Sequence, residues 1–255
     1  MKIRTIQLFL LLVSGWITTP AVYGQFTLDL ESGAVVSSPY NEARVPNATG
    51  TTIDLAKDMK TQPAIFFRLR AGYTFGRRHT VSALLAPLSV KSKGGLNKNV
   101  NYNGVLFPIG TNLESTFKFN TYRLTYRYNV LQTNRFRLGL GITGLLRDAS
   151  IRLRSETSNT AFDNVGIVPL LHYNLWWNPI RRLLILSEAD ASYSRFGQAF
   201  DVFAGVAYRI TPTTAIKAGY RVIEGGTNVD TVYTSSWLNF ASVGLLFTFG
   251  KDENE

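Results

Sequence analysis

Two histidines are the residues in this 255-residue sequence whose ordinary pKa suits acid–base chemistry near neutral pH. Ser82 follows His79 by three positions, a spacing that puts the two side chains on opposite faces of a strand. His172 stands alone in LLHYNLWW, which favours a hydrogen-bonded interior residue over a general base. The sequence has no cysteine and no group of residues at metal-ligand spacing. We therefore predict no catalytic residue, no metal site and no cofactor.

A set of charges that alternates with apolar residues is the strongest chemical pattern in the sequence. Buried charges are tolerated only when they are paired or hydrated, so we expect these groups, with His172, to form an ion-pair network in the interior. Cations outnumber carboxylates in the set, so a path through the network would favour anions. The carboxylates are Asp29, Glu31, Glu188, Asp190 and Asp201, and the cations are Arg68, Arg70, Arg123, Arg127, Arg137, Arg147, Arg209, Lys217 and Arg221.

The elements that carry these charges are predicted to be strands. In FNTYRLTYRYNV, Leu124 and Tyr126 share one parity and Arg123 and Arg127 share the other, and a period of two indicates a strand with one apolar and one polar face. Many glycines lie on the polar face, which suits a crowded interior better than a solvated surface. We expect about ten strands, near 25–36, 63–75, 79–90, 116–130, 135–153, 164–177, 182–194, 199–210, 214–223 and 237–249.

The predicted connections alternate between short and long. GRR, LQTN, NPIR and TPTT are short, whereas the stretches near 37–62, 91–115 and 224–236 are longer and polar. Short turns at one end and longer loops at the other are typical of transmembrane β-barrels. The sequence therefore predicts an all-β, antiparallel up-and-down transmembrane barrel of about ten strands, with eight as the alternative.

The first 24 residues have the pattern of a secretory signal peptide. Lys2 and Arg4 precede an apolar run, and small residues follow before Gln25. We predict three segments: a signal peptide over 1–24 with cleavage near Gly24/Gln25, a barrel over 25–249 and a short polar tail over 250–255.

Aromatic residues gather on the apolar parity beside the predicted short turns. An aromatic girdle at the membrane interface is expected at that position. Its predicted members are Tyr73, Phe75, Tyr126, Tyr128, Phe136, Trp177, Tyr208, Phe247 and Phe249.

The signal peptide, the alternating strands and the final strand SVGLLFTF resemble the outer-membrane β-barrel superfamily of Gram-negative bacteria. The resemblance implies a location in the outer membrane, contact with its lipids and lipopolysaccharide, and recognition of a terminal aromatic residue by the barrel-assembly machinery. GKDENE follows Phe249, so the recognition signal would be internal.

Two enzyme classes of small barrels fail to match. Small-barrel lipid A deacylases place a histidine and a serine two apart on one strand, whereas His79 and Ser82 are three apart. Omptin-type proteases use a histidine at the extracellular rim, and neither histidine here lies near a long loop.

We therefore expect an integral outer-membrane barrel with a structural or interaction role. A lumen of ten strands holds a polar plug or a narrow, anion-preferring path, because wide channels need about 16 strands. The alternatives are an enzyme acting on lipid or peptide, and an adhesin or receptor that binds through its loops. The net charge of +10 favours anionic lipid headgroups as partners, and export argues against nucleic acid.

Overall fold

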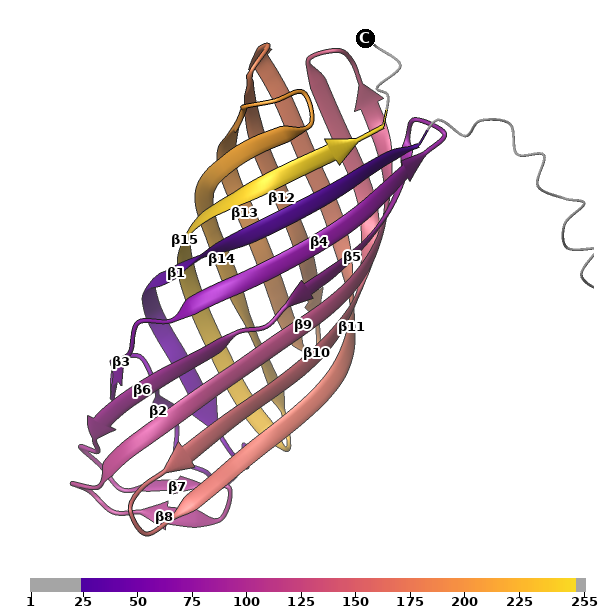
Figure 1. Cartoon of the computed structure of the whole chain (residues 1–255). Helices are drawn as coiled ribbons and strands as arrows, with labels where there is room; N and C mark the ends of the chain where they lie inside the picture. The colour runs from indigo at the N-terminus through magenta and orange to yellow at the C-terminus, as the bar shows by residue number, and fades with distance from the viewer. Residues whose placement is uncertain (1–23, 251–255) are drawn as a thin grey trace, which may run out of the picture.

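The computed structural model describes residues 24–250, which form a closed antiparallel barrel of ten strands (Figure 1). The predicted signal peptide, apart from Gly24, and the predicted tail, apart from Gly250, lie outside the described residues. The wall strands are β1 (Gln25–Arg44), β4 (Ile65–Phe75), β5 (His79–Ala86), β9 (Asn112–Gln132), β10 (Phe136–Arg154), β11 (Asn159–Ile180), β12 (Leu183–Ser194), β13 (Gly197–Arg209), β14 (Thr214–Val229) and β15 (Val232–Phe249).

Each wall strand pairs with its neighbours in chain order, and β15 returns to pair with β1. Phe26 lies opposite Phe249, so the barrel closes where the described chain begins and ends. β6 (Ser89–Gly95) continues the line of β5 after Pro87, and both pair with β9. The predicted up-and-down topology and all ten predicted strands are thus confirmed.

The two ends of the barrel differ. The turns after β4, β9, β11 and β13 and both ends of the described chain lie at the turn end, at the top of Figure 1. The opposite, loop end carries four short strands within its two long connections: β2 (Ile53–Asp54), β3 (Lys60–Thr61), β7 (Val100–Tyr102) and β8 (Val105–Phe107).

Several strands run farther toward the loop end than the sequence pattern predicts. β1 continues to Arg44, and the predicted loop at 224–236 is instead the end of β14 and the start of β15, joined at Asp230 and Thr231. In these extensions the apolar residues point inward and the polar residues point outward, the reverse of the arrangement nearer the turn end. The sequence pattern therefore did not identify the extensions as parts of the strands.

The outer face of β9 shows this change within one strand. Near the turn end, Arg123 points inward and is buried, whereas Leu124 points outward with 63% of its surface exposed. Near the loop end, apolar Phe117 is buried inside and Lys118 lies outside, paired with Asp148 at 2.9 Å. Along β9, a segment arranged as in a water-soluble protein therefore comes first, and a segment with charged residues inside and apolar residues outside comes after it.

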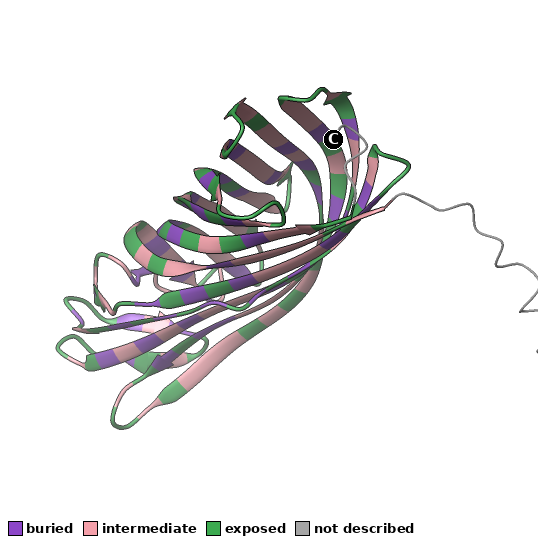
Figure 2. Cartoon of the chain, turned by 45° about the horizontal axis from the view of Figure 1, so that its top comes forward, coloured by how far each residue is buried: buried purple, intermediate pink, exposed green. Residues whose placement is uncertain are grey.

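An apolar belt surrounds the barrel between its turns and the level of Asp148. Figure 2 shows exposed and buried residues alternating along the strands, as the two-residue period requires. Leu124, Ile142, Ile167 and Val243 are among the exposed outward residues. A continuous apolar belt of this kind is the surface that a barrel presents to lipid. No helix within residues 24–250 has the length and apolar character needed to span a membrane.

The interior is not uniformly polar, because it contains two apolar clusters that the predicted polar lumen did not include. A large apolar cluster fills the loop end, and a smaller one, Leu184, Leu186, Phe203, Ala207, Ala215 and Leu246, lies toward the turn end. The paired charges lie between the two clusters on the β12–β15 side, whereas on the opposite side polar residues such as Thr74, Thr80 and Arg127 continue to the turn end.

Candidate functional site

Arg221 on β14 is the centre of a charge network that crosses the barrel interior. Its guanidinium donates to both carboxylate oxygens of Glu31, at 2.8 and 2.9 Å, to Asp201 at 2.5 Å and to Glu188 at 3.0 Å. Its side chain is 2% exposed. One buried arginine thus joins carboxylates from β1, β12 and β13.

Arg123 on β9 forms a second centre beside the first. It contacts Asp190 at 2.6 Å and Asp201 at 2.7 Å. Asp190 also accepts a hydrogen bond from Thr143 at 2.9 Å and lies 2.8 Å from Nδ1 of His172. Asp201 links the two centres, because it contacts both Arg123 and Arg221.

Three further cations complete the network. Arg68 pairs with Asp201 at 3.1 Å, and Arg70 pairs with Glu188. Lys217 contacts Asp29 at 2.7 Å and Glu31 at 2.8 Å. The network therefore holds five carboxylates and five cations, and its formal charges cancel when His172 is neutral. Charge balance and direct pairing make such burial tolerable.

Phe203 and two glycines shape the floor of this network. The Lys217 ammonium and the Arg221 guanidinium each lie 5.0 Å from the centre of the Phe203 ring, as in a cation–π interaction. A Cβ atom at Gly219 or Gly205 would lie within 2.7 Å of that ring. The inward glycines at these two positions make room for a large neighbour, as the sequence pattern suggested.

Four predicted network cations lie apart from the carboxylates. Arg127 donates to Thr80 at 3.2 Å, Arg137 lies over the ring of Trp176, Arg147 donates to Asn164, and Arg209 donates to the carbonyl of Arg181 at 3.2 Å. The predicted excess of cations therefore lies outside the paired centre. The parity of a strand assigns a side chain to the inner face but not to a height along the barrel, so sequence reasoning could not separate these four.

A cavity lies between the network and the turn end. Arg70, Arg127, Arg137 and Lys217 line it with Asp29 and Glu188, so cations outnumber carboxylates among its lining residues. His172 also lines this cavity. Among residues 24–250 no hydroxyl makes a hydrogen bond with the His172 ring, and no group of three acidic or histidine residues could hold a metal ion.

The predicted aromatic girdle lies on the outer face at the turn end. Tyr73, Phe75, Tyr126, Trp177, Tyr208 and Phe249 are exposed, and Tyr128, Phe136 and Phe247 are half-buried among them. His79 also points outward here, where it stacks on Phe75 and lies 2.8 Å from the Tyr126 hydroxyl.

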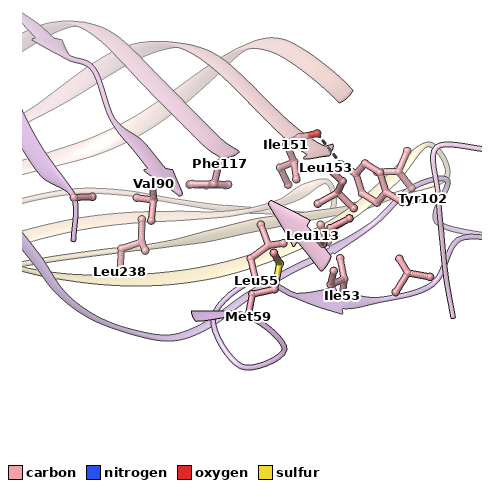
Figure 3. Packing of buried hydrophobic residues seen from close by; sticks show 14 of the residues in the cluster. Ile53, Leu55, Met59, Val90, Tyr102, Leu113, Phe117, Ile151, Leu153 and Leu238 are labelled. Carbon is pink, nitrogen blue, oxygen red and sulfur yellow. Dashed lines mark hydrogen bonds between the residues drawn. The ribbon is translucent and has the colours of Figure 1, made fainter. Parts of the chain in front are cut away.

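Two lids close the loop end. Residues 45–62 and 96–111 fold inward and pack Ile53, Leu55, Met59, Tyr102 and Phe107 against the strands (Figure 3). In the second lid, the Tyr102 hydroxyl donates to the carbonyl of Ile151 at 3.2 Å. Burial raises the pKa of Tyr102, which keeps this donor protonated.

The signal for the second lid was present in the sequence. Asn103 and Gly104 both have positive φ and form the two-residue turn between β7 and β8. Asn-Gly between short apolar runs is a strong hairpin signal.

Comparisons with known proteins find likenesses of structure only. The outer membrane protease OmpT from Escherichia coli is 10% identical, with a TM-score of 0.54 over 91% of this chain and 99% of that chain. Ail of Yersinia pestis is 12% identical, with a TM-score of 0.37 over 89% of this chain and 99% of that chain. Neisserial surface protein A is 15% identical, with a TM-score of 0.37 over 88% of this chain and 97% of that chain. Neither a family model nor a curated protein matches the sequence.

The likeness to OmpT bears on the fold alone. That fold is a closed antiparallel β-barrel, as predicted.

Proposed function

We propose that this protein is an integral protein of the bacterial outer membrane whose barrel is sealed along its axis. Its role is structural or interactive, and it does not act as a general pore. The observation that carries this proposal is the network of five carboxylates and five cations across the interior, with Arg221, Arg123, Glu31 and Lys217 each nearly inaccessible to solvent. Separating such buried ion pairs to admit a hydrated solute would be costly.

The apolar clusters support the same proposal. Water and ions would have to pass the apolar cluster that the two lids form with the strands at the loop end. Hydrophobic constrictions close channels by excluding water. Any residual leak would favour anions, because cations outnumber carboxylates in the lining of the turn-end cavity.

The proposal includes the biogenesis of the protein. The signal peptide is removed near Gly24, the barrel-assembly machinery inserts the chain, and the outer surface contacts lipid and lipopolysaccharide. The apolar belt and the outward aromatic residues at the turn end support this placement.

Planar-bilayer recording tests the sealed lumen. Refolded protein should give no conductance or only small steps, and a general porin in the same bilayers is the positive control. Large, stable steps would overturn the proposal. Membrane fractionation with a heat-modifiability gel tests the membrane location, and a soluble protein without a heat-dependent mobility shift would contradict it.

An enzyme acting on lipid or peptide is the second candidate. Its supporting observation is the pair of His172 and Asp190 beside the turn-end cavity. The Thr143 hydroxyl donates to Asp190, and no hydroxyl among the described residues makes a hydrogen bond with the His172 ring, so this candidate ranks below the sealed barrel. Loss of a lipid-modifying activity in His172→Ala, with the heat-modifiability shift retained, would reverse this order.

A loop-based adhesin or receptor is the third candidate. Leu106 and Ile109 are exposed in the second lid and could contact a partner. Ligand binding that disappears when residues 97–110 are replaced by a short linker would support it.

A further inference from the structure

The pairing between β11 and β12 stops well before the loop end. Leu171 and Ala191 form the last pair, whereas β11 remains paired with β10 from Asn159 to Trp177. The segment 159–170 of β11 therefore has no strand partner on its β12 side. Pro169 lies just past the last pair, and proline fits within a sheet only where no backbone donor is needed. We call this opening in the wall the slot.

The slot lies at the loop-end edge of the apolar belt. Ile167 and Leu171 are strongly exposed on the outer face of β11 at its height, and Asp148, above the belt, lies opposite Val165. On the other side, β12 ends at Ser194 and turns directly into β13, leaving Phe196 exposed. The slot thus faces the region that lipid chains and their headgroups would occupy.

An apolar cavity lies behind the slot. The space behind the slot, together with the solvent at its open mouth, is about 940 Å³. Its floor is the Arg123, Asp190 and Asp201 cluster, whose charges are already paired. Apolar side chains of its wall include Phe117, Phe119, Leu145, Phe162, Val168 and Leu170.

The same cavity contains one cation without a carboxylate. Arg147 donates to the Asn164 amide oxygen and makes no ion pair with the described residues. Its Nε atom is buried and has no hydrogen-bond partner. Glu224 also lines this cavity, but its carboxylate accepts a hydrogen bond from Gln198 at 2.5 Å. Arg147 and the apolar wall beside it are therefore the part of the cavity that is complementary to a molecule with an apolar chain and an anionic head.

We propose that this cavity binds a single-chain anionic amphiphile of the fatty-acid class, which reaches it from the membrane through the slot between β11 and β12. The chain lies along Phe117, Phe162 and Leu170, and the carboxylate lies on Arg147. The inference rests on the proposed membrane location and adds a ligand to it.

Displacement of cis-parinarate fluorescence by palmitate measures the binding. Ala199 lines the cavity from β13, so Ala199→Trp fills it and should weaken binding at least tenfold. Ala204 is exposed on the outer face of the same strand, so Ala204→Trp is the matched control and should bind as the unchanged protein does. Equal binding by both variants would place the ligand on the outer surface and overturn the proposal. If Ala199→Trp fails to fold, Val168→Phe replaces it.

Arg147→Met separates recognition of the head from a structural effect. It should weaken palmitate binding about tenfold, the value of one charge-assisted contact, and leave hexadecanol binding unchanged. Unchanged palmitate binding, or an equal loss for both ligands, would contradict the assignment of the head to Arg147.

The route is tested in the cysteine-free background. Val168→Cys carrying a nitroxide label in vesicles should be more accessible to oxygen, which concentrates in lipid, than to a water-soluble nickel chelate. The reverse order would show that the cavity opens to water and would overturn the lateral route. Bilayer conductance of the same preparations tests the sealed lumen separately, so failure of either proposal can be recognised.

Discussion

At the scale of single residues, Arg221 is the side chain on which the interior depends most. It contacts three carboxylates from three strands, so its loss leaves several negative charges buried without their main partner. Arg209, by contrast, contacts only a backbone carbonyl near the turn end. Two arginines on the inner parity therefore differ in their surroundings and should differ in their contribution to stability.

Arg221→Met should lower the free energy of unfolding by about 3–5 kcal/mol, the usual effect of breaking a buried ion pair from one side. Arg209→Met should change it by less than about 0.5 kcal/mol, as exposed substitutions do. Urea unfolding in lipid vesicles measures both. The same unfolding midpoint for the two variants would mean that the network does not stabilise the barrel.

At the scale of elements, the β7–β8 hairpin has two different faces. Phe107 is 1% exposed within the apolar cluster, whereas its neighbour Leu106 is 62% exposed. Hydrogen bonds from Asn103 to Thr160 and to the carbonyl of Ala161 hold the turn against β11. The lid is therefore a local unit that packs on the barrel without belonging to its wall.

Phe107→Ala should loosen this lid and leave the barrel intact. The loss of a buried phenylalanine costs about 3–5 kcal/mol, so the lid should open more often even though Val100 and Tyr102 still anchor it. Limited proteolysis should therefore cleave within 96–111 faster, while the heat-modifiability shift stays unchanged. Leu106→Ala is the control and should be cleaved at the original rate. Equal cleavage of both variants would show that Phe107 does not anchor the lid.

At the scale of the whole molecule, the outer surface of the barrel has an apolar zone and a polar zone. In the proposed membrane location, the belt around Leu124 faces lipid and the extension around Lys118 faces water, although both lie on the outer face of β9. The interior changes in the opposite sense, from charged to apolar. The same ten strands therefore bury paired charges at one level of the interior and apolar side chains at another.

Leu124→Lys tests the lipid-facing assignment. Lysine at the midplane of a barrel's lipid face costs about 2–4 kcal/mol, whereas the same change on a watery surface is nearly neutral. Thr116→Lys is the matched control, because Thr116 shares the outer face of β9 but lies in the extension. Unfolding in vesicles should therefore show a large loss for the first variant only. Equal stabilities would mean that the belt does not contact lipid.

The sequence by itself determined the ten strands, their inner and outer faces and the outward aromatic residues at the turn end. Each of these follows from the two-residue period of a strand, which is a local property of the chain. The alternation around Arg123 and Leu124 was sufficient to orient β9.

Only the tertiary structure decided which charges meet. Lys217 reaches Asp29 from 188 positions away, and Arg221 reaches Glu31 from 190. Such pairs depend on the tilt and stagger of the strands that close the barrel, because these fix the height of each side chain along the barrel axis. The local alternation of residues does not encode tilt or stagger. The same geometry places Arg127, Arg137, Arg147 and Arg209 away from the network. It also folds the lids inward and leaves the slot beside Pro169. These features depend on the relative lengths and the register of neighbouring strands, which the alternation within a single strand does not encode.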